Sequence, residues 1–226
     1  MIARSPEDVL RPLNDVERRN APKLLYLEGD VALLRAAPRM AVVGARQASP
    51  EALRRTARLA RELVELGVTV VSGLALGVDT AAHEGTLAAG GRTVAVLGTP
   101  LDDVHPRQNR ALQERIGREH LLVSQFAQGT PTVPSNFPRR NRTMALLCDA
   151  TVIVEAGEGS GTLHQGWEAL RLGRPLFLLR SLFDRTDLSW PAEMHAHGAV
   201  VLSGVEQLVD ALALGAPEPD LLVAPF

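Results

Sequence analysis

Loops that combine glycine or serine with polar side chains are the first candidates for chemistry in this sequence. Three such loops each follow an apolar run and precede a stretch with helical spacing. They are Gly44-Ala45-Arg46-Gln47, Ser72-Gly73-Leu74-Ala75-Leu76-Gly77 and Gly157-Glu158-Gly159-Ser160-Gly161-Thr162. Glycine lets a ligand approach the backbone closely, and free N–H groups at the start of a helix bind anions. These loops are typical of phosphate sites, although the third also fits a tight turn that simply requires glycine.

Four arginines at the starts of two expected helices favour an anionic ligand. They are Arg107, Arg139, Arg140 and Arg142. A cation in the first turn of a helix is unfavourable with the helix dipole, so these positions indicate an external anion, with solvated arginines as the alternative. Phe137 lies just before three of them, and arginine beside an aromatic ring suits single-stranded nucleic acid, which offers both phosphates and bases.

Other kinds of site lack their usual residue spacing. The sequence shows no Ser-His-Asp arrangement, paired carboxylates or metal-ligand spacing, so we predict no catalytic residue, no metal and no cofactor. It has no G-x-G-x-x-G fingerprint and no G-x-x-x-x-G-K-[ST] loop, which disfavours a standard NAD site and a P-loop ATPase. Cys148 is the only cysteine, which excludes an intramolecular disulfide and a cysteine-based metal cluster.

The elements that must position these loops alternate regularly from residue 40 onwards. Short apolar runs predict strands at 40–44, 68–71, 93–97, 121–123, 150–154, 175–179 and 199–202, with an edge strand at 24–27. Amphipathic stretches between them predict helices over about 50–66, 78–89, 106–116, 140–147, 162–172 and 205–214. Ser49 and Pro50 supply the N-cap and first-turn proline of the first of these helices.

Strands without polar alternation are buried on both faces, which is typical of parallel sheets. The pattern therefore predicts an α/β fold with a doubly wound, mostly parallel sheet and helices on both faces. Ligands of such sheets bind beyond the carboxyl ends of the strands. The loops expected to meet there are 44–49, 72–78, 98–107, 125–142 and 156–162.

Composition sets the remaining limits. The chain has 226 residues and a net charge of −2, and its 24 basic residues are arginines except for Lys23. Residues 104–142 carry seven arginines and two glutamates, whereas residues 143–226 carry four arginines and eleven acids, so a local basic face is expected. No apolar run reaches the roughly 18 residues of a membrane helix, and the N-terminus lacks a signal-peptide pattern, so we expect a cytoplasmic protein.

Taken together, five motifs resemble the DprA/Smf family of DNA-processing proteins and occur in the order of that family. They are Val42-Val43-Gly44-Ala45-Arg46, Ser72-Gly73 through His83, His105-Pro106-Arg107-Gln108-Asn109, Phe137-Pro138-Arg139-Arg140-Asn141-Arg142, and Val154-Glu155-Ala156 through Ser160-Gly161-Thr162-Leu163. The resemblance covers about residues 11–180. It implies an extended Rossmann-like core that binds single-stranded DNA, with a phosphate site formed by Gly44, Arg46, Ser72, Gly73, Arg107, Arg139, Arg140, Asn141, Arg142, Ser160, Gly161 and Thr162.

The resemblance also implies a biological role. Such a protein acts in DNA uptake, competence, natural transformation and homologous recombination by protecting single-stranded DNA and helping to load the RecA recombinase, and it forms a homodimer. We expect a lead-in at 1–39, a Rossmann-like DprA core at 40–215 and a C-terminal tail at 216–226. A minimal or divergent member is expected, without a preceding sterile-alpha-like domain or a following winged helix.

Departures from the family pattern leave a second function open. His105 stands where the family usually has tyrosine, and Ser124-Gln125 stands where it usually has serine-glutamate. The Gly159-Ser160-Gly161-Thr162 turn followed by Glu168 also resembles the LOG nucleoside-monophosphate phosphoribohydrolases, in which Glu168 or Glu155 would be the acid. The alternative is therefore a nucleotide-binding sensor or a LOG-like hydrolase, and a scaffold that binds only a protein partner is a third possibility.

Overall fold

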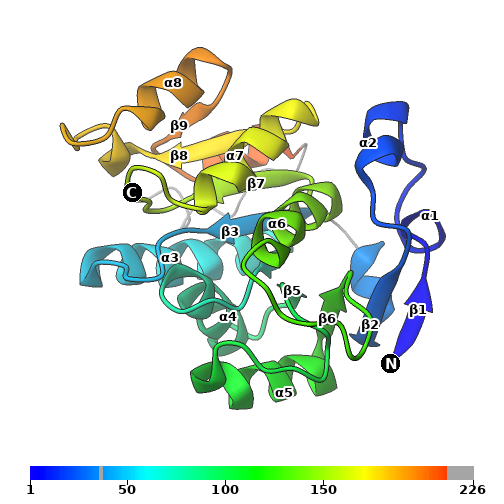
Figure 1. Cartoon of the computed structure of the whole chain (residues 1–226). Helices are drawn as coiled ribbons and strands as arrows, with labels where there is room; N and C mark the ends of the chain where they lie inside the picture. Colours follow the sequence, from blue (N-terminus) through cyan, green and yellow to red (C-terminus); the bar gives the residue numbers. More distant parts are fainter. Residues whose placement is uncertain (36–37, 213–226) are drawn as a thin grey trace.

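The computed structural model describes residues 1–35 and 38–212 (Figure 1). Nine strands of this part form one mixed sheet. They are β1 (Ile2–Arg4), β2 (Leu25–Gly29), β3 (Arg39–Val43), β4 (Thr69–Ser72), β5 (Thr93–Leu97), β6 (Leu121–Ser124), β7 (Ala150–Ile153), β8 (Leu176–Leu179) and β9 (Val200–Leu202). The predicted strands are all present, and β1 is an addition to them. Because β1 pairs with β2, the prediction that 24–27 forms an edge strand is wrong and β1 takes the edge of the sheet.

The strand order is β1-β2-β6-β5-β4-β3-β7-β8-β9. From β6 to β9 across the sheet all neighbours are parallel, while the β1–β2 and β2–β6 pairs are antiparallel. Starting from β3, the chain adds β4, β5 and β6 on one side and then returns to add β7, β8 and β9 on the other. This reversal confirms the predicted doubly wound, mostly parallel sheet.

Helices cover both faces of the sheet (Figure 1). The α-helices of the described part are α1 (Pro6–Val9), α2 (Asp15–Asn20), α3 (Pro50–Glu65), α4 (Val78–Ala88), α5 (Arg110–Glu119), α6 (Asn136–Leu147), α7 (Thr162–Arg171), α8 (Trp190–Ala196) and α9 (Glu206–Ala211). One face carries α3, α4, α5 and α9, whose buried side chains pack against Val70, Val152 and Leu97. The other face carries α6, α7 and α8, packed on Val43, Val96 and Ile153. Short 3-10 helices cover Val31–Leu34, Arg107–Asn109 and Arg180–Leu182.

The start of α3 confirms its predicted cap, whereas α6 begins four residues earlier than predicted. The Ser49 hydroxyl accepts a hydrogen bond from the Ala52 N–H at 3.1 Å, and Pro50 is the first helical residue. In α6 the first residue is Asn136, and Pro138 therefore lies in the first turn. Proline is tolerated there because N–H groups of the first turn have no partner within the helix.

The N-terminal residues are part of the same sheet and core. β2 pairs with β6, β1 pairs with β2, and Leu10, Leu13 and Leu25 are buried in one cluster with the β-sheet residues. The domain division at residue 40 remains a prediction. The predicted tail at 216–226 and the end of the predicted 205–214 helix lie outside the described residues. Within the described ranges, no helix combines the length and the apolar character needed to cross a membrane.

Candidate functional site

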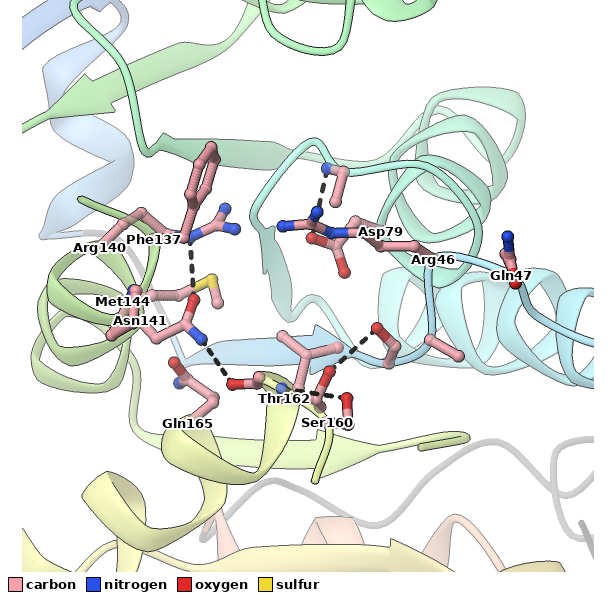
Figure 2. Close-up of a pocket in the computed structure, with 16 residues that line it drawn as sticks. Arg46, Gln47, Asp79, Phe137, Arg140, Asn141, Met144, Ser160, Thr162 and Gln165 are labelled. Atoms are coloured by element: carbon pink, nitrogen blue, oxygen red, sulfur yellow. Dashed lines mark hydrogen bonds between the residues drawn. The ribbon is translucent and has the colours of Figure 1, made fainter. Parts of the chain in front are cut away.

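A hollow of about 550 Å³ lies at the carboxyl ends of β3 and β7, where the strand order reverses. Ligands of doubly wound sheets bind at such a point. We call it the main hollow, and its lining is Val43, Gly44, Ala45, Arg46, Gln47, Ala75, Asp79, Phe137, Pro138, Arg140, Asn141, Met144, Ser160, Gly161, Thr162 and Gln165. Figure 2 shows α6 side chains facing the loop after β3, with Ser160, Thr162 and Gln165 along a third side.

Hydrogen bonds between loops hold the rim of the main hollow in place. The Thr162 hydroxyl donates to the Gly44 carbonyl at 3.0 Å, which joins the start of α7 to the loop after β3. The Asn141 side-chain amide donates to the Gly161 carbonyl at 3.0 Å, which joins α6 to the glycine-rich turn (Figure 2). These two bonds therefore preorganise three of the four segments that line the main hollow, the fourth being the stretch that carries Ala75 and Asp79.

Arg140 is a buried cation at the centre of this arrangement. Only 5% of the residue is exposed, and its guanidinium donates to the Val96 carbonyl at 2.8 Å and to the Asn141 side-chain oxygen at 2.9 Å. Burial and the neighbouring Arg46 charge lower its pKa, whereas Asp79 acts in the opposite direction. No carboxylate of the described residues lies within 4 Å of its nitrogens, and the more distant Asp79 carboxylate offsets its charge only through the longer-range attraction between the two groups.

Asp79 organises the loop that follows β4. Its carboxylate accepts hydrogen bonds from the Gly73 N–H at 3.1 Å and the Ala75 N–H at 3.4 Å. Burial raises the pKa of this carboxyl group, while the Arg140 charge and the two N–H donors lower it. Its hydrogen bonds indicate a structural role in shaping the wall of the main hollow.

Arg46 and Phe137 form the exposed wall. The Arg46 guanidinium carbon lies 5.4 Å from the centroid of the Phe137 ring, and the His105 ring centroid lies 5.5 Å from it. A side hollow of about 190 Å³ continues from this wall and is also lined by Gly73, Gly98 and His105. This wall presents a positive charge beside aromatic surface, a combination that suits both the phosphate and the base of a nucleotide.

The predicted site residues fall into three groups. The first group lines the two hollows: Gly73 lines the side hollow, and the main hollow is lined by Gly44, Arg46, Arg140, Asn141, Ser160, Gly161 and Thr162. Ser72 is fully buried and donates to the Val42 carbonyl at 2.7 Å, and the exposed Arg107 lines neither hollow. Arg139 and Arg142 lie around α6, away from the main hollow, because successive helical residues are rotated by about 100°.

Nine residues line the main hollow without having been predicted as site residues, and the polar or large ones among them are Gln47, Asp79, Phe137, Met144 and Gln165. Helical spacing could have identified three of them. Phe137 and Met144 are one turn from Arg140 and Asn141 on α6, and Gln165 is one turn from Thr162 on α7. Gln47 and Asp79 lie in or next to loops, where spacing gives no such signal.

The two glutamates considered for a hydrolase lie outside the lining of the main hollow. The Glu155 carboxylate accepts from the Ser49 N–H at 2.8 Å and from the Ser49 hydroxyl at 2.7 Å. Glu168 pairs with Arg142 at 2.9 Å and with Arg171 at 2.5 Å. Across residues 1–35 and 38–212, no group of three or more His, Cys, Asp or Glu side chains is placed to hold a metal ion.

Comparison with protein families supports the resemblance seen in the motifs. The family model described as DNA recombination-mediator protein A matches residues 6–213. The chain is 40% identical over 160 residues to DNA processing protein DprA of Streptococcus pneumoniae, covering 71% of this chain and 56% of that protein. It is 38% identical over 175 residues to protein Smf of Synechocystis, covering 77% of this chain and 44% of that protein. The chain therefore spans about half the length of these two relatives.

Solved structures agree with the architecture. DNA processing protein A of Streptococcus pneumoniae matches with a TM-score of 0.81 and 32% identity, over 92% of this chain and 73% of that one. The protein of the same name from Helicobacter pylori, solved in a study of its single-stranded DNA binding mode, matches with a TM-score of 0.77 and 28% identity, over 93% and 95%. A molybdenum cofactor carrier protein from Chlamydomonas reinhardtii, at 21% identity and a TM-score of 0.54 over 79% and 96%, shares the fold.

Proposed function

Because the chain belongs to the DNA recombination-mediator protein A family, the family of DprA and Smf, we propose that it binds single-stranded DNA at the main hollow. One observation carries this proposal. Arg46, Arg140 and the Phe137 ring converge at the reversal of strand order, and neither arginine has a carboxylate partner within 4 Å among the described residues. The single-stranded DNA binding of the Helicobacter pylori relative supports the choice of ligand.

In the proposed complex, the arginines and the loop backbones contact phosphate, and the aromatic wall receives a base. Arg46 is exposed and can contact the DNA strand directly. The buried Arg140 attracts the DNA electrostatically from the inner wall of the main hollow. Base stacking on Phe137 would be tolerant of sequence because every base has a flat face. Binding of this kind has low sequence specificity and weakens steeply as salt is added.

The wider role follows from the family and is part of the proposal. The protein would protect single-stranded DNA and help to load RecA in natural transformation and recombination, as a homodimer in the cytoplasm. It would act by binding, without a catalytic step. The chain spans only about half of the length of the two relatives described above.

Fluorescence anisotropy of labelled oligo-dT across a salt series tests this function. We expect tight binding that weakens with salt, and a much weaker affinity in Arg46→Gln because an exposed phosphate contact is lost. Arg61→Gln, which removes the same charge from the exposed surface of α3, is the matched control and should bind as the wild type does. Weak binding at low salt, or a flat salt dependence, would contradict the proposal.

A nucleotide-binding sensor or LOG-like hydrolase is the second candidate, since the main hollow has the volume of a small-molecule site. Its weakness is the lack of an available acid, because Asp79 is bound by two backbone N–H groups and Glu155 by Ser49. Release of adenine from AMP by the purified protein, with no affinity for oligo-dT, would favour this candidate over DNA binding.

A further inference from the structure

A second basic hollow lies across α6 from the main one. This outer hollow has a volume of about 440 Å³ and is lined by Asn20, Ala21, Pro22, Lys23, Leu24, Tyr26, Gln125, Arg139, Arg142 and Thr143. In Figure 1, α7 lies on one side of α6, and α2 and β2 lie on the other. Arg139 and Arg142 do not line the main hollow, and they line the outer hollow instead.

The lining of the outer hollow carries three cations and no carboxylate. Lys23 is exposed, and neither it nor Arg139 has an ion pair among the residues that the structure describes. Arg142 pairs with Glu168 at 2.9 Å, yet 57% of its side chain remains exposed. Several other exposed arginines are paired along their helix, as Arg54 is with Glu51 and Arg115 is with Glu119. The outer hollow thus concentrates positive charge that the protein does not neutralise internally.

Neighbouring side chains hold this charge in position and add nucleotide-compatible surface. The Arg139 guanidinium carbon lies 5.2 Å from the centroid of the Phe126 ring, a cation–π contact that directs its charge. The half-buried Tyr26 ring and the exposed Leu24 side chain provide apolar surface in the same lining. Gln125 is a neutral polar residue beside the cations, where an acid would repel an anion.

We propose that the outer hollow is a second phosphate-binding subsite, and that a single DNA strand held in the main hollow crosses α6 to reach it. This inference rests on the proposed single-stranded DNA binding. A helix with its side chains is about 10–12 Å across, so one strand of a few nucleotides can contact both sides of α6. The subsite takes the phosphodiester backbone, with Lys23, Arg139 and Arg142 as its cations.

Two oligo-dT probes, of about 4 and about 16 nucleotides, separate the two subsites because the short one fills the main hollow alone. We expect Lys23→Gln and Arg139→Gln each to lower the affinity for the long probe about fivefold at about 0.1 M salt. Each should also reduce the slope of log affinity against log salt by about 0.7, and the affinity for the short probe should not change. Gln125→Glu should weaken the long probe likewise. Arg19→Gln, which removes a charge from the nearby α2 outside the lining, is the matched control.

The single lysine of the chain provides a direct readout of contact. An oligonucleotide with an abasic aldehyde forms an imine with an amine, and cyanoborohydride reduces this imine to a stable adduct. Peptide mapping should then place the long probe on Lys23. Lys23→Arg keeps the charge and should retain affinity while losing that adduct, leaving only reaction at the N-terminal amine.

The outcomes distinguish the subsite from the proposed function on which it rests. If Arg46→Gln weakens both probes but the Lys23 and Arg139 variants bind the long probe normally, the subsite is wrong and DNA binding stands. If Arg19→Gln weakens the long probe as much as Arg139→Gln does, the effect is general charge and the subsite is wrong. If the wild type binds neither probe, both proposals are wrong.

Discussion

At Gly73 the backbone approaches the Arg140 guanidinium so closely that a side chain has no room. A Cβ placed on Gly73 would lie 1.6 Å from the nearer guanidinium nitrogen. This glycine therefore accommodates a buried cation, in addition to any role in shaping the loop. Gly98 serves Phe137 in the same way, because a Cβ there would lie 2.6 Å from the ring. Two glycines from different loops thus allow two α6 side chains to reach the hollows.

Gly161 offers a test of ligand contact that leaves the fold intact. A Cβ at this position meets no atom within 4 Å, and φ is −59°, so Gly161→Ala introduces neither a clash nor backbone strain. We expect its unfolding free energy to change by less than about 1 kcal/mol. Its affinity for oligo-dT should fall, because the added methyl group occupies the rim of the main hollow.

Gly157→Ala is the matched control for this substitution. Gly157 belongs to the same turn, and a methyl group added there would also meet no atom within 4 Å, but this residue does not line the main hollow. Urea unfolding and anisotropy should find both variants stable and only the Gly161 variant impaired in binding. Equal affinity of the two variants would show that the ligand does not approach the start of α7.

At the scale of elements, α6 contributes more to the basic surface than any loop does. Its first two turns send Arg140 and Asn141 into the main hollow and Arg139, Arg142 and Thr143 into the outer hollow. No acid lies in its first turn, and the Ser135 side chain makes no capping bond. The N–H groups of Asn136 and Phe137 instead bond to the Val133 and Pro134 carbonyls, so the arginines rather than free N–H groups make this end of α6 attractive to an anion.

α4 contains a group whose titration is linked to folding. His83 is fully buried, its Nδ1 lies 2.7 Å from the Thr93 hydroxyl, and its Nε2 has no partner in the structure. Burial and the Arg140 charge lower the pKa of His83 to about 3. The unfolded chain, in which histidine has its usual pKa of about 6.5, therefore binds a proton that the folded chain excludes.

We expect this histidine to make the protein less stable as the pH falls from about 6.5 towards 3. Its contribution to the unfolding free energy should decline by up to about 1.4 kcal/mol per pH unit in that window. Urea unfolding at a series of pH values measures the slope of the unfolding free energy against pH. His83→Gln should reduce this slope, and the part that comes from carboxylates should remain. The same slope in both proteins would mean that His83 becomes protonated in the folded state.

At the scale of the whole molecule, a buried ionic cluster attaches the N-terminal residues to the sheet. Glu17 on α2 is 1% exposed and pairs with Arg174, which lies between α7 and β8, at 2.6 Å and with Arg11 at 2.7 Å. Burial raises the pKa of this carboxyl group, but the hydrogen bonds from Arg174, the Asn14 N–H and Arg11 outweigh it and hold the pKa at about 2. The contribution of this cluster is present above about pH 4.5 and declines as the pH falls through about 2.

Glu17→Gln should destabilise the protein by about 3 kcal/mol, because it leaves the Arg174 charge buried without its partner. Urea unfolding at neutral pH measures this loss. Glu7→Gln breaks an ion pair with Arg18 that is exposed on both sides and is the control, with little expected change. A similarly small effect in the Glu17 variant would show that the cluster is hydrated in solution.

Local patterns in the sequence were enough to predict the elements, the sheet type and the family. Apolar runs and helical spacing are local properties, so strands such as 93–97 and the capped start of α3 could be predicted to within a residue. The five motifs identified the family because residue type and order suffice for recognition. The predicted start of α6 at about residue 140 was wrong by four residues, because the first turn of a helix accepts proline and α6 therefore begins before Pro138.

Which charged residues act together depends on the tertiary structure. Arg139, Arg140 and Arg142 form one cluster in the sequence, yet rotation around α6 and packing on the sheet separate them into two hollows. Lys23 joins Arg139 only because β2 pairs with β6, which brings residues from opposite halves of the chain to one surface. Contacts of this kind depend on long-range strand pairing, and no local pattern of residues encodes them.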